Sequence, residues 1–172
     1  MLHGGYLLGV DPALACGFAV VREDGSHVQS GTWRLQTRAH QGHGGRFCNL
    51  VAHLDSIVST FPSIVSVAYE VPGHLRVNGG MASPATYLGL YGLVAHVESW
   101  AESRELHYSG VTPQAVKMAC GAPGNAKKAD VLACVERRFG LTFSANDHNE
   151  ADALGVALAG LRLLRTQQDR IA

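Results

Sequence analysis

The sequence predicts an α/β domain in which helices flank a mixed five-stranded sheet, and three observations support this fold class. Three short strand patterns come first and are joined by tight links, which is typical of an antiparallel meander. Strand and helix patterns then alternate along the rest of the chain, as they do in αβ units. A meander followed by such units indicates a mixed sheet and not an all-parallel one.

Runs of β-branched and aliphatic residues predict the five strands, at residues 6–11, 17–22, 27–35, 64–70 and 106–111. The second and third strands are separated by a tight turn at residues 23–25. The glycines at residues 42–45 interrupt the next stretch, and residues 72–82 are expected to form a glycine-containing loop.

Helical spacing of apolar residues begins at Phe47, and Pro62 closes that first helix. Ser83 followed by Pro84 is a strong helix start, since serine caps a helix and proline suits its first turn. Three further helices are expected at residues 112–120, 126–139 and 151–164.

The bulk composition fits a single domain over residues 1–172. No apolar run reaches the roughly 18–20 residues that cross a bilayer, and no secretion signal is recognisable at the start. The four cysteines lack metal-binding spacing, so reduced thiols and a cytoplasmic location are expected, or an organellar matrix or viral factory if the source is not bacterial. A formal net charge of zero neither supports nor excludes a nucleic-acid partner.

Two acidic residues, Asp11 and Glu70, each end a predicted strand. One acid alone at the end of a strand is equally well explained as a turn residue or as a functional residue. Two carboxylates at one rim of a sheet repel each other unless a cation joins them. Hard divalent ions such as Mg²⁺ bind carboxylate oxygens, so the pair indicates a metal site.

The head of the last predicted helix supplies further polar groups. Asp152 stands among alanine, leucine and valine residues, where an unpaired acid is costly, and this favours a functional role. His148 and Asn149 precede it by four and three residues and share its face if the helix extends that far. Asp147 has capping-box spacing to Glu150, so capping and metal binding are equally open for it.

A pair of lysines, Lys127 and Lys128, stands at the start of the helix expected over residues 126–139. They are either a solvated first turn or a binding site for an anion. Because lysines at a helix N-terminus oppose the helix dipole, the anionic partner is slightly favoured.

Five segments together resemble the RuvC family of resolvases, nucleases that cut four-way DNA junctions. They are Gly9-Val-Asp-Pro12 with Gly17-Phe-Ala-Val-Val21, Ala68-Tyr-Glu70, Val111-Thr-Pro-Gln-Ala-Val-Lys117, Gly124-Asn-Ala-Lys-Lys128 and Asn149-Glu-Ala-Asp-Ala-Leu154. Each segment alone is weak evidence for the family, but the five together, in this order over some 140 residues, are a strong signal.

The resemblance implies a ribonuclease H-like fold, a homodimer that grips a four-way junction, and two divalent ions per active site, Mg²⁺ with Mn²⁺ as a substitute. Asp11, Glu70 and Asp152 match three of the family's four catalytic acids, and Lys117 and Lys128 match basic residues that serve the cut backbone. Asn149 stands where the family usually has aspartate or histidine, so His148 or Asp147 is a candidate for the fourth ligand. The nucleic-acid-binding set is Lys117, Lys127, Lys128 and Arg76.

A two-metal mechanism follows from the resemblance. Asp11 bridges both ions, Glu70 and Asp152 hold one each, His148 is a ligand or proton acceptor, and Lys128 counters charge that develops on the phosphate.

Two other functions stay open. The first is a protein of the same fold that binds junctions or other branched DNA, with an altered substrate or without cleavage, and the second, less favoured, is one lobe of an actin-like ATPase.

Dimerisation is expected through the helix after Ser83. Its apolar face includes Tyr87, Leu88, Tyr91 and Ala95, and Gly89 and Gly92 allow close approach. Packing of that face on the protein's own sheet is the alternative.

Overall fold

The computed structural model describes residues 4–37, 42–73, 76–77, 80–81, 83–144 and 148–169. Its main sheet has five strands in the order β3-β2-β1-β4-β7. The bounds are β1 Tyr6–Asp11, β2 Ala15–Arg22, β3 His27–Arg34, β4 Ile64–Glu70 and β7 His107–Val111. Strands β1, β2 and β3 pair antiparallel, whereas β4 pairs parallel with both β1 and β7. The predicted mixed five-stranded sheet is therefore confirmed.

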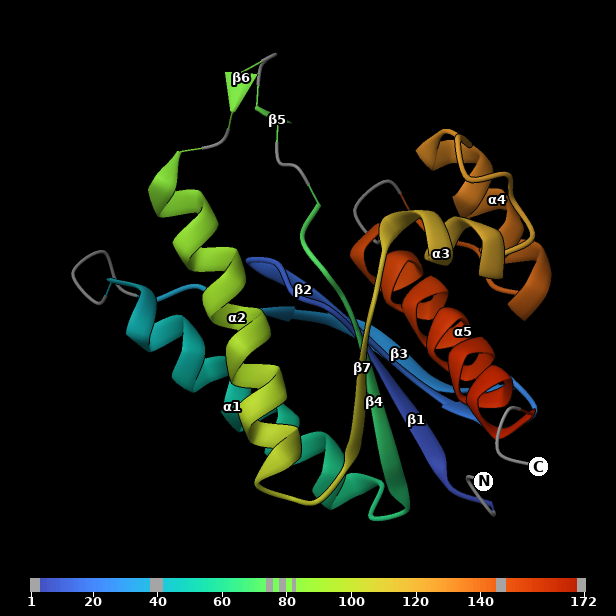
Figure 1. Cartoon of the computed structure of the whole chain (residues 1–172), viewed down its shortest axis with the longest axis horizontal. Helices are drawn as coiled ribbons and strands as arrows, with labels where there is room; N and C mark the ends of the chain where they lie inside the picture. Colours follow the sequence, from blue (N-terminus) through green and yellow to red (C-terminus); the bar gives the residue numbers. More distant parts are fainter. Residues whose placement is uncertain are drawn as a thin grey trace.

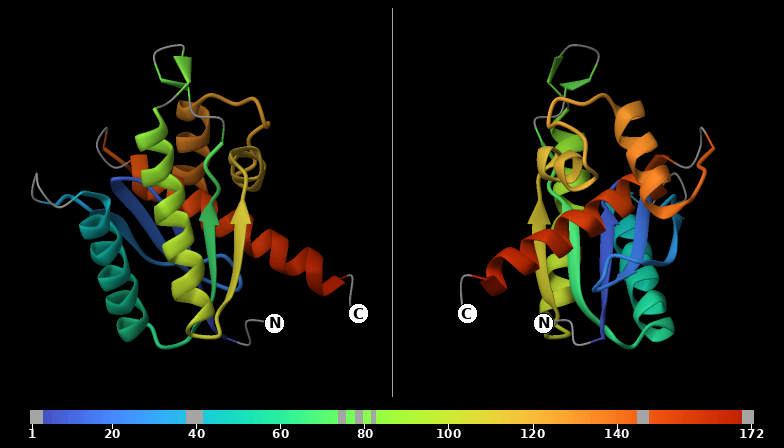
Figure 2. Two further views of the ribbon diagram at one scale, coloured as in Figure 1. Left: turned by 60° about the vertical axis from the view of Figure 1, so that its left-hand side comes forward. Right: turned by 90° about the vertical axis from the view of Figure 1, so that its right-hand side faces the viewer.

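Helices cover both faces of this sheet, as Figures 1 and 2 show. One face carries α1 (Gly42–Thr60) and α2 (Pro84–Glu102), and the other carries α3 (Pro113–Ala119), α4 (Lys128–Phe139) and α5 (His148–Asp169). Alternate residues of β1 separate the two cores, since Leu7 packs under α5 and Leu8 packs under α1 and α2. In the described residues, no helix is long and apolar enough to cross a membrane.

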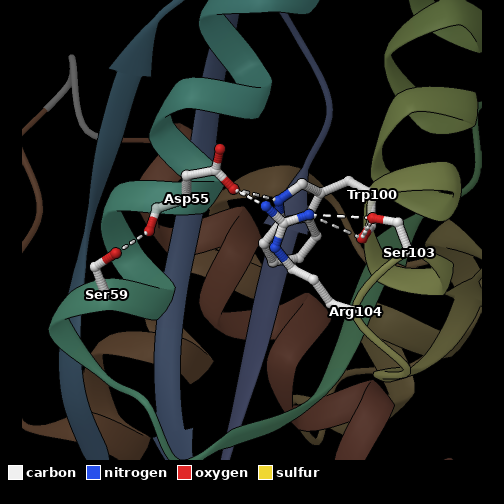
Figure 3. A network of polar contacts seen from close by, with 5 residues as sticks. All are labelled: Asp55, Ser59, Trp100, Ser103 and Arg104. Carbon is white, nitrogen blue, oxygen red and sulfur yellow. Dashed lines mark hydrogen bonds and ion pairs between the residues drawn. The ribbon is translucent and has the colours of Figure 1, made fainter.

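The two helices of the first layer are joined by a polar contact around Asp55 (Figure 3). Its Oδ1 atom accepts hydrogen bonds from Trp100 Nε1 at 2.8 Å and from the Arg104 guanidinium. That guanidinium also lies 4.8 Å from the centre of the Trp100 ring. One carboxylate on α1 therefore fixes the C-terminal part of α2, at the end of the molecule away from Asp11.

Several predicted boundaries were wrong, and tertiary packing explains the differences. Helix α1 begins at Gly42 and includes the glycines that were expected to interrupt it. Its first turns pack on α2, where His43 lies against Gly89 and the Phe47 ring lies against Gly92. Gly89 and Gly92 therefore allow α1 to pack closely on α2. Because α1 contacts them, they are not available for the approach of a second copy of the chain.

The segment expected to be a loop contains a small hairpin, β5 (Arg76–Val77) and β6 (Gly80–Met81). The sequence Asn78-Gly79 between these strands favours a two-residue hairpin turn, a signal that the loop prediction overlooked. Figure 1 shows the hairpin beyond the N-terminal end of α2, at the end of the molecule where β4 finishes.

Helix α5 is longer than predicted at both ends and lies unusually close to the sheet. A Cβ atom on Gly9 would lie 2.6 Å from the Ala153 carbonyl oxygen, and one on Gly17 would overlap the Asn149 carbonyl. Because real Cβ atoms do not approach backbone this closely, only glycine at these two positions lets the helix backbone rest on β1 and β2.

We therefore expect Gly17→Ala to lower the free energy of unfolding by about 2 kcal/mol or more, because the added methyl group must push α5 away from β2. Urea unfolding followed by circular dichroism measures this change. Gly44→Ala is the matched control, since nothing lies within 4 Å of a Cβ there. It should stabilise α1 by about 0.5 kcal/mol. Equal stability of Gly17→Ala and the wild type would contradict the close contact.

Candidate active site

Three carboxylates gather at one rim of the sheet, each delivered by a different element. Asp11 ends β1 and Glu70 ends β4, and the parallel register that pairs Val10 with Tyr69 sets these acids level on adjacent strands. Asp152 lies in the second turn of α5, the helix that packs closely on the sheet at Gly9 and Gly17. The predicted meeting of the strand-end acids with the last helix therefore occurs.

Burial and mutual repulsion act together on these carboxyl groups. Burial raises the pKa of Asp11 to about 7, with a further rise from the charge of Asp152 and a partial offset from Lys128. The pKa of Glu70 is also raised to about 7, first by burial and then by the charges of Asp11 and Asp152. The site thus holds like charges without enough positive charge to balance them.

Lysine side chains supply the positive charge that the site does contain. Lys128, the first residue of α4, donates a hydrogen bond from Nζ to Asp152 Oδ2 at 2.7 Å. Its side chain is 60% exposed, so water screens this ion pair substantially. Lys117 on α3 is near enough for its charge to lower the pKa of Glu70. The structure therefore places Lys128 against Asp152 and Lys117 within electrostatic reach of Glu70.

Helix α5 begins at His148, so His148 lies one turn before Asp152 on the same face, as expected if the helix started early. Its Nδ1 atom is buried and has no hydrogen-bond partner. No hydrogen bond or ion pair joins His148 to the three carboxylates within the described part of the chain. Asp147 lies outside the described residues, as does the side chain of Arg76. Lys127 precedes α4, and its backbone N–H donates to Asp130.

A second set of residues holds the first turn of α5, and the sequence analysis missed its role. The Ser30 hydroxyl on β3 donates to Glu150 Oε1 at 2.5 Å, and His27 Nε2 lies 2.8 Å from the same hydroxyl oxygen. In the sequence, Glu150 is singled out only by its capping-box spacing to Asp147, which lies outside the described residues. The contact joins residues 120 positions apart, and no local pattern predicts such a pair.

The side chains gathered at the rim are of the chemical type that binds a hard divalent cation. Carboxylate oxygens are the ligands that Mg²⁺ prefers, and a cation would offset the repulsion that adds to the effect of burial on both pKa values. The unpartnered His148 Nδ1 offers one more donor atom. In the chain as described, however, no three histidine, cysteine or acidic side chains come close enough together to hold one metal ion. The carboxylates share one electrostatic environment, and Lys128 bonds one of them.

The sheet order, the layers and the position of the carboxylates define a protein with the ribonuclease H-like fold. Residues 7–160 match the family described as crossover junction endodeoxyribonuclease RuvC. The chain therefore belongs to the RuvC family. A RuvC from Chlorobium phaeobacteroides is 33% identical over 90% of this chain and 80% of the relative. For a RuvC from Saccharopolyspora erythraea the identity is 29%, over 90% of this chain and 76% of the relative.

Two solved structures share the fold at low sequence identity. Thermus thermophilus RuvC in complex with a Holliday junction substrate superposes with a TM-score of 0.74 at 20% identity, covering 94% of this chain and 96% of that chain. The yeast mitochondrial Holliday junction resolvase gives a TM-score of 0.60 at 13% identity, over 96% of this chain and 84% of that chain. These matches extend the likeness across both helical layers.

The raised pKa values predict how the stability of the metal-free protein depends on pH. Folded Asp11 and Glu70 hold protons more tightly than the unfolded chain does between about pH 4 and about pH 7, so stability falls as pH rises through this window. In EDTA at pH 8, we expect Asp11→Asn to melt about 5 °C above the wild type, because it removes one of the repelling charges. Differential scanning calorimetry at pH 5.5 and pH 8 measures both effects.

Asp24→Asn is the control for this experiment, because hydrogen bonds from Ser26 lower the pKa of Asp24 at an exposed turn. That substitution should not raise the melting temperature at pH 8. If Asp11→Asn is no more stable than the wild type at pH 8, the three carboxylates do not repel each other as described.

Proposed function

We propose that this chain is a structure-specific endodeoxyribonuclease that resolves four-way (Holliday) DNA junctions by paired phosphodiester hydrolysis, with residues 1–172 acting as one nuclease domain. The observation that carries the proposal is the meeting of Asp11, Glu70 and Asp152 at one rim, where burial and repulsion hold two carboxyl pKa values at about 7. Such a cluster is costly in a protein that only binds DNA. Membership of the RuvC family supports the reaction and the substrate. The bacterial relatives and the four unpaired cysteines support a cytoplasmic location.

The proposed cofactor is Mg²⁺, with Mn²⁺ as a substitute and two ions in each site. Asp11, Glu70 and Asp152 would hold these ions, and the resemblance to the family assigns Asp11 to both ions and Glu70 and Asp152 to one each. When bound, the two ions supply Lewis-acid stabilisation of the charge that develops on the attacking and leaving oxygens. His148, with its free Nδ1 atom, is our candidate for the fourth group, while Asp147 and Asn149 remain alternatives.

The lysines complete the site in this proposal. Lys128 neutralises Asp152 in the absence of metal. In the proposed reaction the Lys128 ammonium group would stabilise the charge that develops on the phosphate that is cut. Lys117 and Lys127 bind neighbouring phosphates, and Arg76 on the β5–β6 hairpin is proposed to contact the junction. His148 either binds metal or accepts the proton of the attacking water.

Cleavage of labelled four-way, Y-shaped and linear duplexes, with and without Mg²⁺ or Mn²⁺, tests the function. We expect the four-way junction to be cut preferentially and only with metal. Asp11→Asn should lower the rate by orders of magnitude while leaving junction binding nearly intact, because phosphate contacts come from other residues.

Asp24→Asn, at the far end of the molecule, is the control and should cut normally. A junction bound tightly but never cut by the wild type would favour a binding protein without cleavage. Cleavage by Asp11→Asn at the wild-type rate would remove Asp11 from the site.

A homodimer is also proposed, because α2 carries apolar side chains that its own sheet does not cover. Leu88 is 65% exposed and Tyr91 is 47% exposed, and the Tyr87 and Tyr91 rings stack with their centres 6.2 Å apart. These side chains lie on the turns of α2 nearest the rim that carries the carboxylates. A twofold contact there would bring two active sites to one junction, one for each cut strand.

Light scattering tests this proposal. We expect a particle of twice 18.3 kDa for the wild type at tens of micromolar. Leu88→Asp should reduce it to the monomer, because a buried unpaired carboxylate opposes association. Leu163→Asp is the control, since Leu163 is a partly exposed leucine on α5, in the opposite layer, and that variant should remain dimeric. A wild-type monomer with and without DNA would count against the dimer.

A further inference from the structure

A hollow of about 360 Å³ lies between the first turns of α1 and α2. Leu14, Leu90 and Leu93 supply an apolar wall, and His43 and Arg46 supply its charged and polar groups. Among the described residues, no aspartate or glutamate lines it. A cavity with a cationic side chain and no acid favours an anionic occupant.

Two polar atoms of this hollow have no hydrogen-bond partner among the described residues. Arg46 Nε and His43 Nδ1 are both buried atoms without a hydrogen bond, and Arg46 forms no ion pair in the described residues. Arg104 and Arg165 differ in this respect, since Arg104 binds Asp55 and Arg165 binds the Glu23 carbonyl oxygen. A buried guanidinium N–H that bonds nothing is costly, and an external acceptor removes that cost.

Helix α1 adds to the preference for an anion. His43 and Arg46 are three residues apart in the first two turns of a 19-residue helix, so they lie on one face near its N-terminus. The first turn contains no acidic residue. Basic side chains here oppose the positive end of the helix dipole, and a bound anion satisfies both.

The hollow lies at the same end of the molecule as the carboxylates. Leu14 follows Asp11 by three residues in the connection from β1 to β2. The carboxylates meet α5 on one face of the sheet, whereas the hollow belongs to the α1 and α2 layer on the other face. A strand of DNA that crosses the rim between these layers can reach both places.

We propose that this hollow binds a backbone phosphate of the DNA substrate, apart from the one that is cut. Arg46 donates to the phosphate oxygens, His43 donates a second hydrogen bond, and the leucine wall packs against the deoxyribose. The proposal rests on the proposed function, because it assumes a DNA substrate. A second copy of the chain is the other conceivable occupant, but the exposed residues on the adjoining turns of α2 offer no carboxylate to pair with Arg46.

Fluorescence anisotropy with a labelled four-way junction in EDTA tests the proposal, since binding is then measured without cleavage. We expect Arg46→Met to weaken binding about tenfold and to reduce the slope of log affinity against log salt concentration by about one, the change for one lost phosphate contact. Arg46→Lys should recover most of the slope, because it keeps the charge. Arg22→Met, at the opposite end of the sheet, is the matched control and should leave both quantities unchanged.

The proposal is overturned if Arg46→Met binds with the wild-type affinity and salt slope. It is also overturned if Arg46→Met and Arg46→Lys weaken binding equally with no change in slope, or if Arg46→Met becomes monomeric where the wild type is a dimer. Failure of the proposed function gives a different result, because the wild type would then fail to cut the junction with Mg²⁺ whatever Arg46 does to binding.

Discussion

The close contact of α5 with β1 and β2 is the constraint on which the rest of the molecule depends. Gly9 and Gly17 let the helix backbone rest on the sheet, where any side chain would hold it away. The small residues Ala151, Ala153 and Ala157 continue the contact along the helix. This approach gives α5 one fixed position, and with it Asp152 comes within electrostatic reach of Asp11. The same glycines that shape the core therefore assemble the site.

The site that results is unfavourable for the folded state alone. Three carboxylates share a partly buried rim, where burial first, and then the charges of the neighbouring carboxylates, raise the pKa values of Asp11 and Glu70 to about 7. The packing that compensates lies elsewhere, in the two cores on either side of the sheet and in contacts such as Ser30 with Glu150. A bound cation would stabilise these three carboxylates. The stability of the folded protein is therefore coupled to metal binding.

The sequence alone predicts most of the fold, because the signals concerned are local. Strand-end acids, the Ser83-Pro84 helix start and the Thr112 cap all lie where their patterns indicate. The failures are non-local. Gly42 begins a helix because α2 supports it, and Glu150 bonds a serine 120 positions away. The Arg46 hollow has no sequence signal, since a lone arginine near glycines resembles any solvated turn, and only its burial without a partner distinguishes it.

A net charge of zero does not oppose binding to a polyanion when the acids and bases are distributed differently. Several acids have partners within the protein: Asp55 with Arg104, Glu98 with Tyr69, Asp130 with the Lys127 N–H, and Glu136 with the Phe143 N–H. Only two ion pairs occur among the described residues, and one of them involves Lys128 at the site. Because salt screens charges more than about 10 Å apart, DNA at the rim senses Lys117, Lys128 and Arg46 more strongly than the distant acids. The charge that matters for recognition is therefore local, and the carboxylates there are the ones a metal ion would neutralise.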